Sequence, residues 1–183
     1  MGTYQSPLTV IVKGALAGAA GTAVMGAFME RAPQILDSFG VKLPEERPGP
    51  TAPDTPTEAM AERIAEGVAQ QPLDDAAKAT AGQAVHWSYG SGWGAIFGVM
   101  QSTLKLPHLV HGAVFGLFVG IVGDTLLPAM RLQRDPRTNP GEINLMHLGS
   151  HVVYGVTTAL VYGLLNFGRR GLAAGCGGTS RAT

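Results

Sequence analysis

Asp124 is the residue whose type and position most directly suggest chemistry. It is the only charged residue between Leu109 and Met130, in an otherwise apolar stretch, and Thr125 follows it. An ionisable group inside a membrane-spanning segment is costly and usually marks an ion or proton pathway. Asp124 lies four residues after Gly120, so it is expected to face neighbouring helices and, with Thr125, to form a proton or cation site. The alternative is a structural acid near a helix end that caps a neighbour or pairs with an arginine.

Three histidines form the second set of candidates. His86 and His151 occupy matching positions in two similar segments, and His147 lies one helical turn before His151. Two histidines on different helices can bind a haem iron from both sides, and two histidines four residues apart can hold a transition metal. The competing interpretation is that each imidazole hydrogen-bonds a carbonyl or hydroxyl near the membrane surface, where Trp and Tyr are common. We therefore predict no cofactor, with a b-type haem between His86 and His151 as the alternative.

Motifs of the common enzyme classes are missing from the sequence. It holds no phosphate-binding loop, nucleophile elbow, zinc-protease motif or paired CxxC. Its 13 Lys and Arg residues balance its 13 Asp and Glu residues, whereas nucleic-acid binding requires a basic patch. The single cysteine, Cys176, has no partner for a disulfide within the chain. We therefore predict neither an enzyme nor a nucleic-acid-binding protein.

These candidates lie in or beside four long segments that carry almost no charge. An apolar helix of about 20 residues spans the hydrocarbon core of a bilayer. We therefore predict an all-α, polytopic membrane protein that forms a single membrane domain over 1–183. The four predicted transmembrane helices cover 8–29, 79–104, 109–130 and 143–167, and a flexible tail covers 168–183. Four spans place both termini on one side, while the arginines after the third and fourth spans leave the orientation open.

The connection at 30–78 is rich in proline, which favours an extended surface segment. Within it the sequence predicts an amphipathic helix at 56–70, outside the bilayer. The start of this helix carries a capping box with proline at the first helical position: Thr55, Pro56 and Glu58. Its apolar stripe consists of Met60, Ile64 and Val68. We expect this stripe to pack over the ends of the transmembrane helices, with a partner-binding face as the alternative.

Two of the predicted spans resemble each other. The segments HWSYGSGWGAIFG and HVVYGVTTALVYG align without a gap, so that His86 matches His151 and Tyr89 matches Tyr154. The first and third spans match more weakly, with KGALAG beside HGAVFG. This pattern predicts an internal repeat whose unit is a pair of helices, with two copies related by a pseudo-twofold axis along the membrane normal.

Small residues spaced four apart occur on every predicted span. In lipid, helices associate through van der Waals contact and hydrogen bonds, and small residues let their backbones approach closely. We therefore expect four close-packed helices with little room for a wide pore. The glycines predicted to form these contacts are Gly14, Gly18, Gly90, Gly94, Gly98, Gly112, Gly116, Gly120, Gly155 and Gly163.

Four features of the chain occur together in one known layout. They are the first span KGALAGAAGTAVMGAFME, the long proline-rich connection, GAVFGLFVG in the third span and HLGSHVVYG at the start of the fourth. This layout resembles the YagU-like family of uncharacterised bacterial inner-membrane proteins, from which the chain departs in its connection and its tail. The family has no assigned reaction. The resemblance therefore implies a multi-pass protein of the bacterial plasma (inner) membrane and no particular mechanism.

Signals for helix packing are abundant in this sequence, and signals for chemistry are few. We therefore predict a non-catalytic accessory or assembly subunit of a larger membrane complex, embedded in the lipid bilayer and bound to other membrane-protein subunits or to itself. The first alternative is a small proton or cation transporter that uses Asp124. The second is a b-type haem protein that transfers electrons through His86 and His151.

Overall fold

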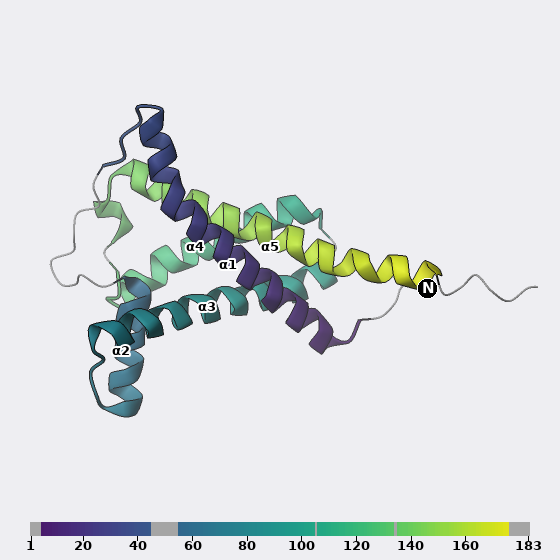
Figure 1. Ribbon diagram of the computed structural model, residues 1–183, viewed down its shortest axis with the longest axis horizontal. Helices are drawn as coiled ribbons and strands as arrows, with labels where there is room; N and C mark the ends of the chain where they lie inside the picture. The colour runs from purple at the N-terminus through teal and green to yellow at the C-terminus, as the bar shows by residue number, and fades with distance from the viewer. Residues whose placement is uncertain (1–4, 45–54, 105, 134, 176–183) are drawn as a thin grey trace, which may run out of the picture.

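Helices make up most of the protein (Figure 1). The computed structural model describes residues 5–44, 55–104, 106–133 and 135–175, with side chains as far as Phe167. The elements are α1 (Pro7–Ser38), α2 (Pro56–Ala69), α3 (Asp75–Leu104), α4 (His108–Ala129), a short 3-10 helix η1 (Pro136–Thr138) and α5 (Gly141–Gly175). No strand occurs in the described ranges, which confirms the predicted all-α class.

Three helices of the described chain are long and apolar enough to cross a membrane. They are α1, α4 and the part of α5 from Gly141 to Phe167. This supports a membrane protein, but with three such helices where the sequence analysis predicted four. The remaining predicted span, 79–104, lies within α3, which has 30 residues but mixes Gly, Ser, Thr, Gln and His with its apolar residues. This mixture lowers the hydropathy of α3 below that of the other three helices.

Two antiparallel helix pairs form the bundle, and α2 lies across one end of it (Figure 1). The first pair is α1 with α3, the second is α4 with α5, and α1 also packs along α5. Direct contacts of α3 with α4 and α5 are few. The end of α1, the start of α3 and the connection between α4 and α5 all lie at the end of the bundle where α2 lies (Figure 1). We call this the α2 end.

Backbones touch within each helix pair. A Cβ atom added to Gly14 would lie 2.5 Å from the carbonyl oxygen of Gly94, and one added to Gly18 would lie 2.7 Å from the Cα of Gly94. In the second pair, a Cβ atom added to Gly112 would lie 2.5 Å from the carbonyl oxygen of Gly155. Since real Cβ atoms do not approach other atoms so closely, these positions admit no side chain larger than hydrogen.

Aromatic rings fill the space between the two pairs. Phe97 on α3 is fully buried and packs edge to face against Phe115 and Tyr162, with ring centroids 5.3 and 6.0 Å away. Two tyrosines of α5 join the pairs directly. The hydroxyl of Tyr154 donates a hydrogen bond to the carbonyl of Gly90 at 2.6 Å, and that of Tyr162 donates to the carbonyl of Gly98 at 3.2 Å. These bonds tie α5 to α3 where the helices themselves have few contacts.

The short helix α2 begins where the sequence predicted, and its capping box is confirmed. The Thr55 hydroxyl accepts from the backbone N–H of Glu58, and the Glu58 carboxylate accepts from the N–H of Thr55. The predicted packing of its apolar stripe is wrong, because Ile64 and Val68 are 51% and 83% exposed. Ala61 is the buried residue instead. A small residue lets α2 approach α3 more closely than the larger stripe would.

Polar contacts hold α2 at the end of the bundle. Lys78 on α3 forms an ion pair with Glu62 at 3.1 Å. The Arg63 guanidinium donates a hydrogen bond to the carbonyl of Met130, just after α4, at 2.6 Å. Through these two contacts α2 links the start of α3 to the end of α4.

Several predictions concern residues outside the described ranges. Residues 45–54 of the proline-rich connection and Cys176 lie there. The backbone of α5 continues to Gly175, through the first half of the segment that the sequence assigned to a tail at 168–183. The rest of that tail, 176–183, lies outside the described residues.

Candidate functional site

Asp124 lies in the last turns of α4, at the α2 end of the bundle. Pro128 is inside the same helix, and proline has no backbone N–H. The carbonyl of Asp124 therefore cannot receive the usual helical hydrogen bond from the residue four positions later. The Asp124 side chain is 19% exposed and points toward α5. This combination provides both a carboxylate and a freed backbone carbonyl at one position.

His147 of α5 is the partner of Asp124. Its Nδ1 lies 3.2 Å from Oδ1 of Asp124, and the imidazole is 30% exposed. Oδ1 is buried, yet it has no hydrogen-bond partner among the described residues. The contact thus has the distance of an ion pair without the alignment of a hydrogen bond. This buried oxygen of Asp124 is therefore in contact with the His147 ring but lacks an aligned hydrogen bond among the described residues.

The other two candidate histidines lie deeper in the bundle. The rings of His147 and His151 are in edge-to-face contact, with centroids 4.6 Å apart. Nδ1 of His151 lies 3.0 Å from the carbonyl oxygen of His147, one turn earlier in α5, which leaves Nε2 for other partners. His86 is half-buried on α3.

The haem alternative gains no further support from these positions. Among the described residues, no hydrogen bond or ring contact joins His86 to His151, and no group of three or more His, Cys, Asp or Glu side chains could hold a metal ion. A haem between His86 and His151 therefore stays a prediction.

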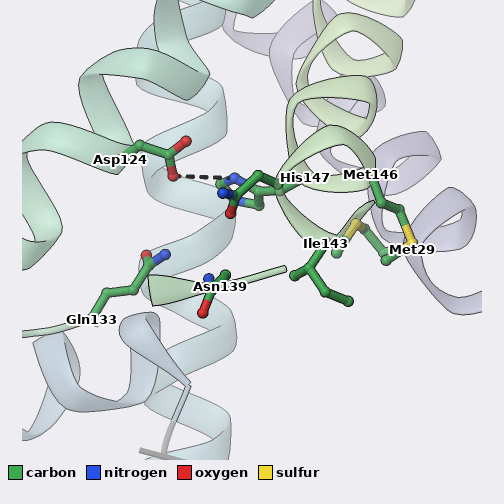
Figure 2. Close-up of a pocket in the computed structure, with 8 residues that line it drawn as sticks. Met29, Asp124, Gln133, Asn139, Ile143, Met146 and His147 are labelled. Atoms are coloured by element: carbon green, nitrogen blue, oxygen red, sulfur yellow. Dashed lines mark ion pairs between the residues drawn. The ribbon is translucent and has the colours of Figure 1, made fainter. Parts of the chain in front are cut away.

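A cavity of about 70 Å³ lies beside the Asp124–His147 pair. Figure 2 shows the Asp124 carboxylate, the His147 ring and the amides of Gln133 and Asn139 around this space. Asn144 also lines it, and its Nδ2 donates to the carbonyl of Pro136 at 2.8 Å, so its Oδ1 remains an available acceptor. The apolar side of the cavity consists of Met29, Ile143 and Met146. Its polar side therefore combines one carboxylate, one imidazole and three amides.

A second hollow, of about 330 Å³, also borders Asp124. It is lined by Asp124, Thr125, Pro128, Asp135, Pro136 and Arg137. The Thr125 hydroxyl donates to the carbonyl of Ile121 at 2.7 Å, within its own helix. Asp135 caps η1 by accepting from the N–H of Arg137 at 2.9 Å. Asp124 is the residue that the two spaces share.

The opposite end of the bundle carries a separate polar cluster. The Lys13 ammonium lies 2.8 Å from Oδ1 of Asn166, which also accepts from the Gln5 amide at 2.9 Å. Nearby on this side, buried His111 contacts Gln101 through Nδ1, while its Nε2 has no partner among the described residues. The contacts described for these groups are hydrogen bonds to side-chain amides, whereas Asp124 and His147 lie at ion-pair distance.

Most of the predicted packing glycines lie at helix contacts. Gly120 lies against α5, where an added Cβ would be 3.1 Å from the ring of His151. Gly163 is the exception, because an added Cβ there would have only His108 within 4 Å, at 3.8 Å. The amides of Gln133, Asn139 and Asn144 were not among the predicted site residues. Their signal in the sequence was weak: a short polar connection directly after the span that carries Asp124.

Comparison with known proteins adds no relative. No protein-family model, no curated protein and no solved structure matches this chain. Its function must therefore be inferred from its own residues.

Proposed function

We propose that this chain is a membrane protein with four transmembrane helices in two related pairs, and that it acts as a non-catalytic accessory or assembly subunit of a larger complex. In this proposal α3 crosses the membrane although its hydropathy is modest, because its glycines pack against α1 along the middle of both helices. A bacterial plasma-membrane location follows from the resemblance to YagU-like proteins and is part of the same proposal.

The contacts of the two pairs support a repeat. The sequence alignment equates Gly14 and Gly94 with Gly112 and Ala159. A Cβ atom on Gly14 would meet Gly94, and a Cβ atom on Gly112 would lie 2.6 Å from the Cβ of Ala159. Contacts at equivalent positions are expected if one helix pair was duplicated.

The accessory role is supported by the close packing of backbones and aromatic side chains inside the bundle. Backbones touch within each pair, and the space between the pairs is occupied by Phe97, Phe115, Tyr154 and Tyr162, all at most 3% exposed. Large apolar residues cover the outside instead, including Leu8 and Leu164 at 69% each. Such a solid bundle is suited to packing against lipid and other helices.

Purification from the native membrane in a mild detergent, followed by mass spectrometry of cross-linked partners, tests this role. Gly92 provides a sharp variant, because it is exposed on α3 and has no atom within 4 Å of an added Cβ. Gly92→Leu should keep the bundle folded while weakening a complex that uses this outer face. A stoichiometric partner supports the proposal. A folded, monodisperse monomer without any partner contradicts it.

A second candidate function is proton or cation transport through Asp124. It is favoured by the position of this carboxylate beside two hollows at the α2 end. Transport would require the packed centre of the bundle to open. Flux into proteoliposomes, compared between the wild type and Asp124→Asn, tests it: flux that is absent, or unchanged by the substitution, rules it out.

A further inference from the structure

The apolar side of α2 is exposed in the folded chain. Val68 is 83% exposed, the largest exposed fraction of any large apolar side chain among the described residues, and Ile64 is also exposed. The two residues are four apart, so they lie on the same side of the helix. Removing such apolar surface from water is favourable in proportion to its area.

Contacts with α3 fix the level at which α2 crosses the bundle. Glu62 pairs with Lys78, directly before the proposed span at 79–104. A Cβ atom added to Gly82, in the first turn of that span, would lie 2.6 Å from Cγ of Glu58. Helix α2 therefore lies level with the start of the α3 span.

The contact with α4 gives the same level. Arg63 donates its hydrogen bond to the carbonyl of Met130, the last residue of the span at 109–130. Figure 1 shows that α2 runs across the long axis of the bundle and reaches past α3 to the side. With the spans crossing a bilayer, α2 lies along the membrane surface, where the hydrocarbon core meets the headgroups.

These neighbours leave two sides of α2 exposed. Glu58 contacts α3, and Arg63 reaches the end of α4. Of the remaining sides, one carries Ile64 and Val68 and the opposite one carries Glu66, because residues two apart point in nearly opposite directions on a helix. A helix that lies along a membrane surface turns its apolar side toward the acyl chains and its charged side toward water.

A second exposed apolar residue lies at the same end of the bundle. Phe39, directly after α1, is 80% exposed, and the end of α1 is at the α2 end (Figure 1). Aromatic side chains are enriched at membrane–water interfaces. The two most exposed large apolar side chains of the described chain, Val68 and Phe39, therefore belong to two different elements at one end.

We propose that α2 is an interfacial helix, which lies in the headgroup region of the bilayer with Ile64 and Val68 against the acyl chains. Its charged residues are three glutamates and one arginine, and that arginine is bonded to the end of α4. Apolar contact with lipid, rather than attraction to anionic headgroups, therefore holds the helix at the surface. The bilayer in this way reinforces the link that α2 makes between the start of α3 and the end of α4.

This inference goes beyond the accessory role and rests on the membrane placement that the proposed function assigns to the bundle. Leu160 separates the two in an experiment. It lies within the α5 span and is 50% exposed, so it should contact the acyl chains wherever α2 lies.

The test uses the full chain in phosphatidylcholine nanodiscs, with Cys176→Ser and one added cysteine that carries a nitroxide label. The added cysteines replace exposed side chains, so the labelled chains should fold. They are Ile64→Cys, Val68→Cys, the matched control Glu66→Cys on the opposite side of α2, and Leu160→Cys. Electron paramagnetic resonance then compares collisions of each label with oxygen, which concentrates in the acyl chains, and with a water-soluble nickel complex.

The labels that replace Ile64 and Val68 should show a several-fold higher ratio of oxygen to nickel collisions than the label that replaces Glu66. Equal ratios on the two sides of α2 would place the helix in water and overturn the proposal. Protection of the apolar side from both reagents would also overturn it, because a second copy or another protein would then cover that side.

The label that replaces Leu160 should collide with oxygen and hardly with nickel. If it does so while the Ile64 and Val68 labels collide freely with nickel, the interfacial helix is wrong and the membrane placement stands. If the Leu160 label is itself open to nickel, the membrane placement is wrong and the interfacial helix is lost with it.

Discussion

The α1–α3 pair and the α4–α5 pair use the same kind of contact but differ in the side chains that surround it. In both, glycine backbones touch in the middle of an antiparallel pair. In the first pair the nearest polar neighbour is Thr22, whose hydroxyl bonds within its own helix to the carbonyl of Gly18 at 3.0 Å. The second pair carries Asp124, His147 and His151 at one end.

Because of this difference, the effects of helix packing and of ionisable side chains can be compared within one molecule. If the pairs arose from one unit, both kept the close glycine contacts, and the second pair carries the Asp124–His147 ion pair. The first pair then shows what the scaffold requires by itself. Glycine substitutions at the closest backbone contacts of each pair can test whether the second pair requires anything more.

The largest effect is expected for Gly94→Ala in the first pair. The added Cβ would overlap the carbonyl oxygen of Gly14 and the Cα of Gly18, and would lie 2.6 Å from the N of Gly18. Backbone atoms cannot move aside cheaply, so the free energy of unfolding should fall by roughly 3 kcal/mol, the upper part of the range for overpacking.

Gly92→Ala is the control for this substitution. It lies on the same helix with open space around the added Cβ. Since alanine favours helix by about 1 kcal/mol over glycine, this variant should be neutral or more stable. Thermal unfolding of both variants in the same detergent gives the comparison. Equal stability of the two would show that α1 and α3 do not pack as described.

A somewhat smaller loss is expected for Gly155→Ala in the second pair. The added Cβ would overlap the carbonyl of Gly112 and would lie 2.7 and 2.8 Å from N and Cα of Gly116. One turn later α5 already carries a side chain, Ala159, against α4. The cost should be about 2 kcal/mol.

Gly149→Ala, on the same helix and without any atom within 4 Å of the added Cβ, is its control. The pairs are equivalent in packing if both core substitutions destabilise the bundle and both controls do not. If Gly94→Ala lowers the free energy of unfolding and Gly155→Ala does not, the two pairs are not equivalent in packing.

Most of the helix positions could be predicted because long uncharged runs bounded by charges are a strong local signal. The capping box of α2 is equally local, and it was predicted correctly from Thr55, Pro56 and Glu58. The buried face of α2 was not predicted correctly. Ala61 gives a weaker hydrophobic signal than Ile64 and Val68, but its small side chain lets α2 lie closer to α3.

Only part of the candidate site could be predicted from the sequence. Asp124 and His147 stand out as ionisable residues in apolar surroundings, but their pairing depends on how α4 and α5 cross. The amides of the cavity come from a connection whose path is set by the ends of two helices. Long-range placement of this kind leaves no periodic pattern along the chain.

A further prediction concerns the bonds between the two pairs. Tyr154→Phe removes the hydrogen bond to the Gly90 carbonyl, and Tyr162→Phe removes the longer bond to Gly98. Hydrogen bonds between transmembrane helices contribute about 0.6 kcal/mol on average and up to about 1.7. Tyr154→Phe should therefore cost about 1 kcal/mol and Tyr162→Phe less.

Tyr89→Phe, at a residue that is 48% exposed, is the control for the tyrosine variants and should cost nothing measurable. Unfolding in graded detergent mixtures measures all three. If Tyr154→Phe is as stable as Tyr89→Phe, the hydrogen bond to Gly90 does not contribute to holding the pairs together, and ring packing and the contact of α1 with α5 suffice.

The smallest effect on stability is expected for Asp124→Asn, and this is what separates chemistry from packing. The amide keeps the size of the carboxylate and removes a charge whose Oδ1 lacks a hydrogen bond. The free energy of unfolding should therefore change by only about 0.5 kcal/mol, because the lost attraction to His147 is offset by the removal of a partly buried charge. Thermal unfolding of the wild type and the variant in the same detergent provides the measurement. A loss as large as that of Gly155→Ala would mean that Asp124 is part of the scaffold, and the two pairs would then differ in packing as well as in charge.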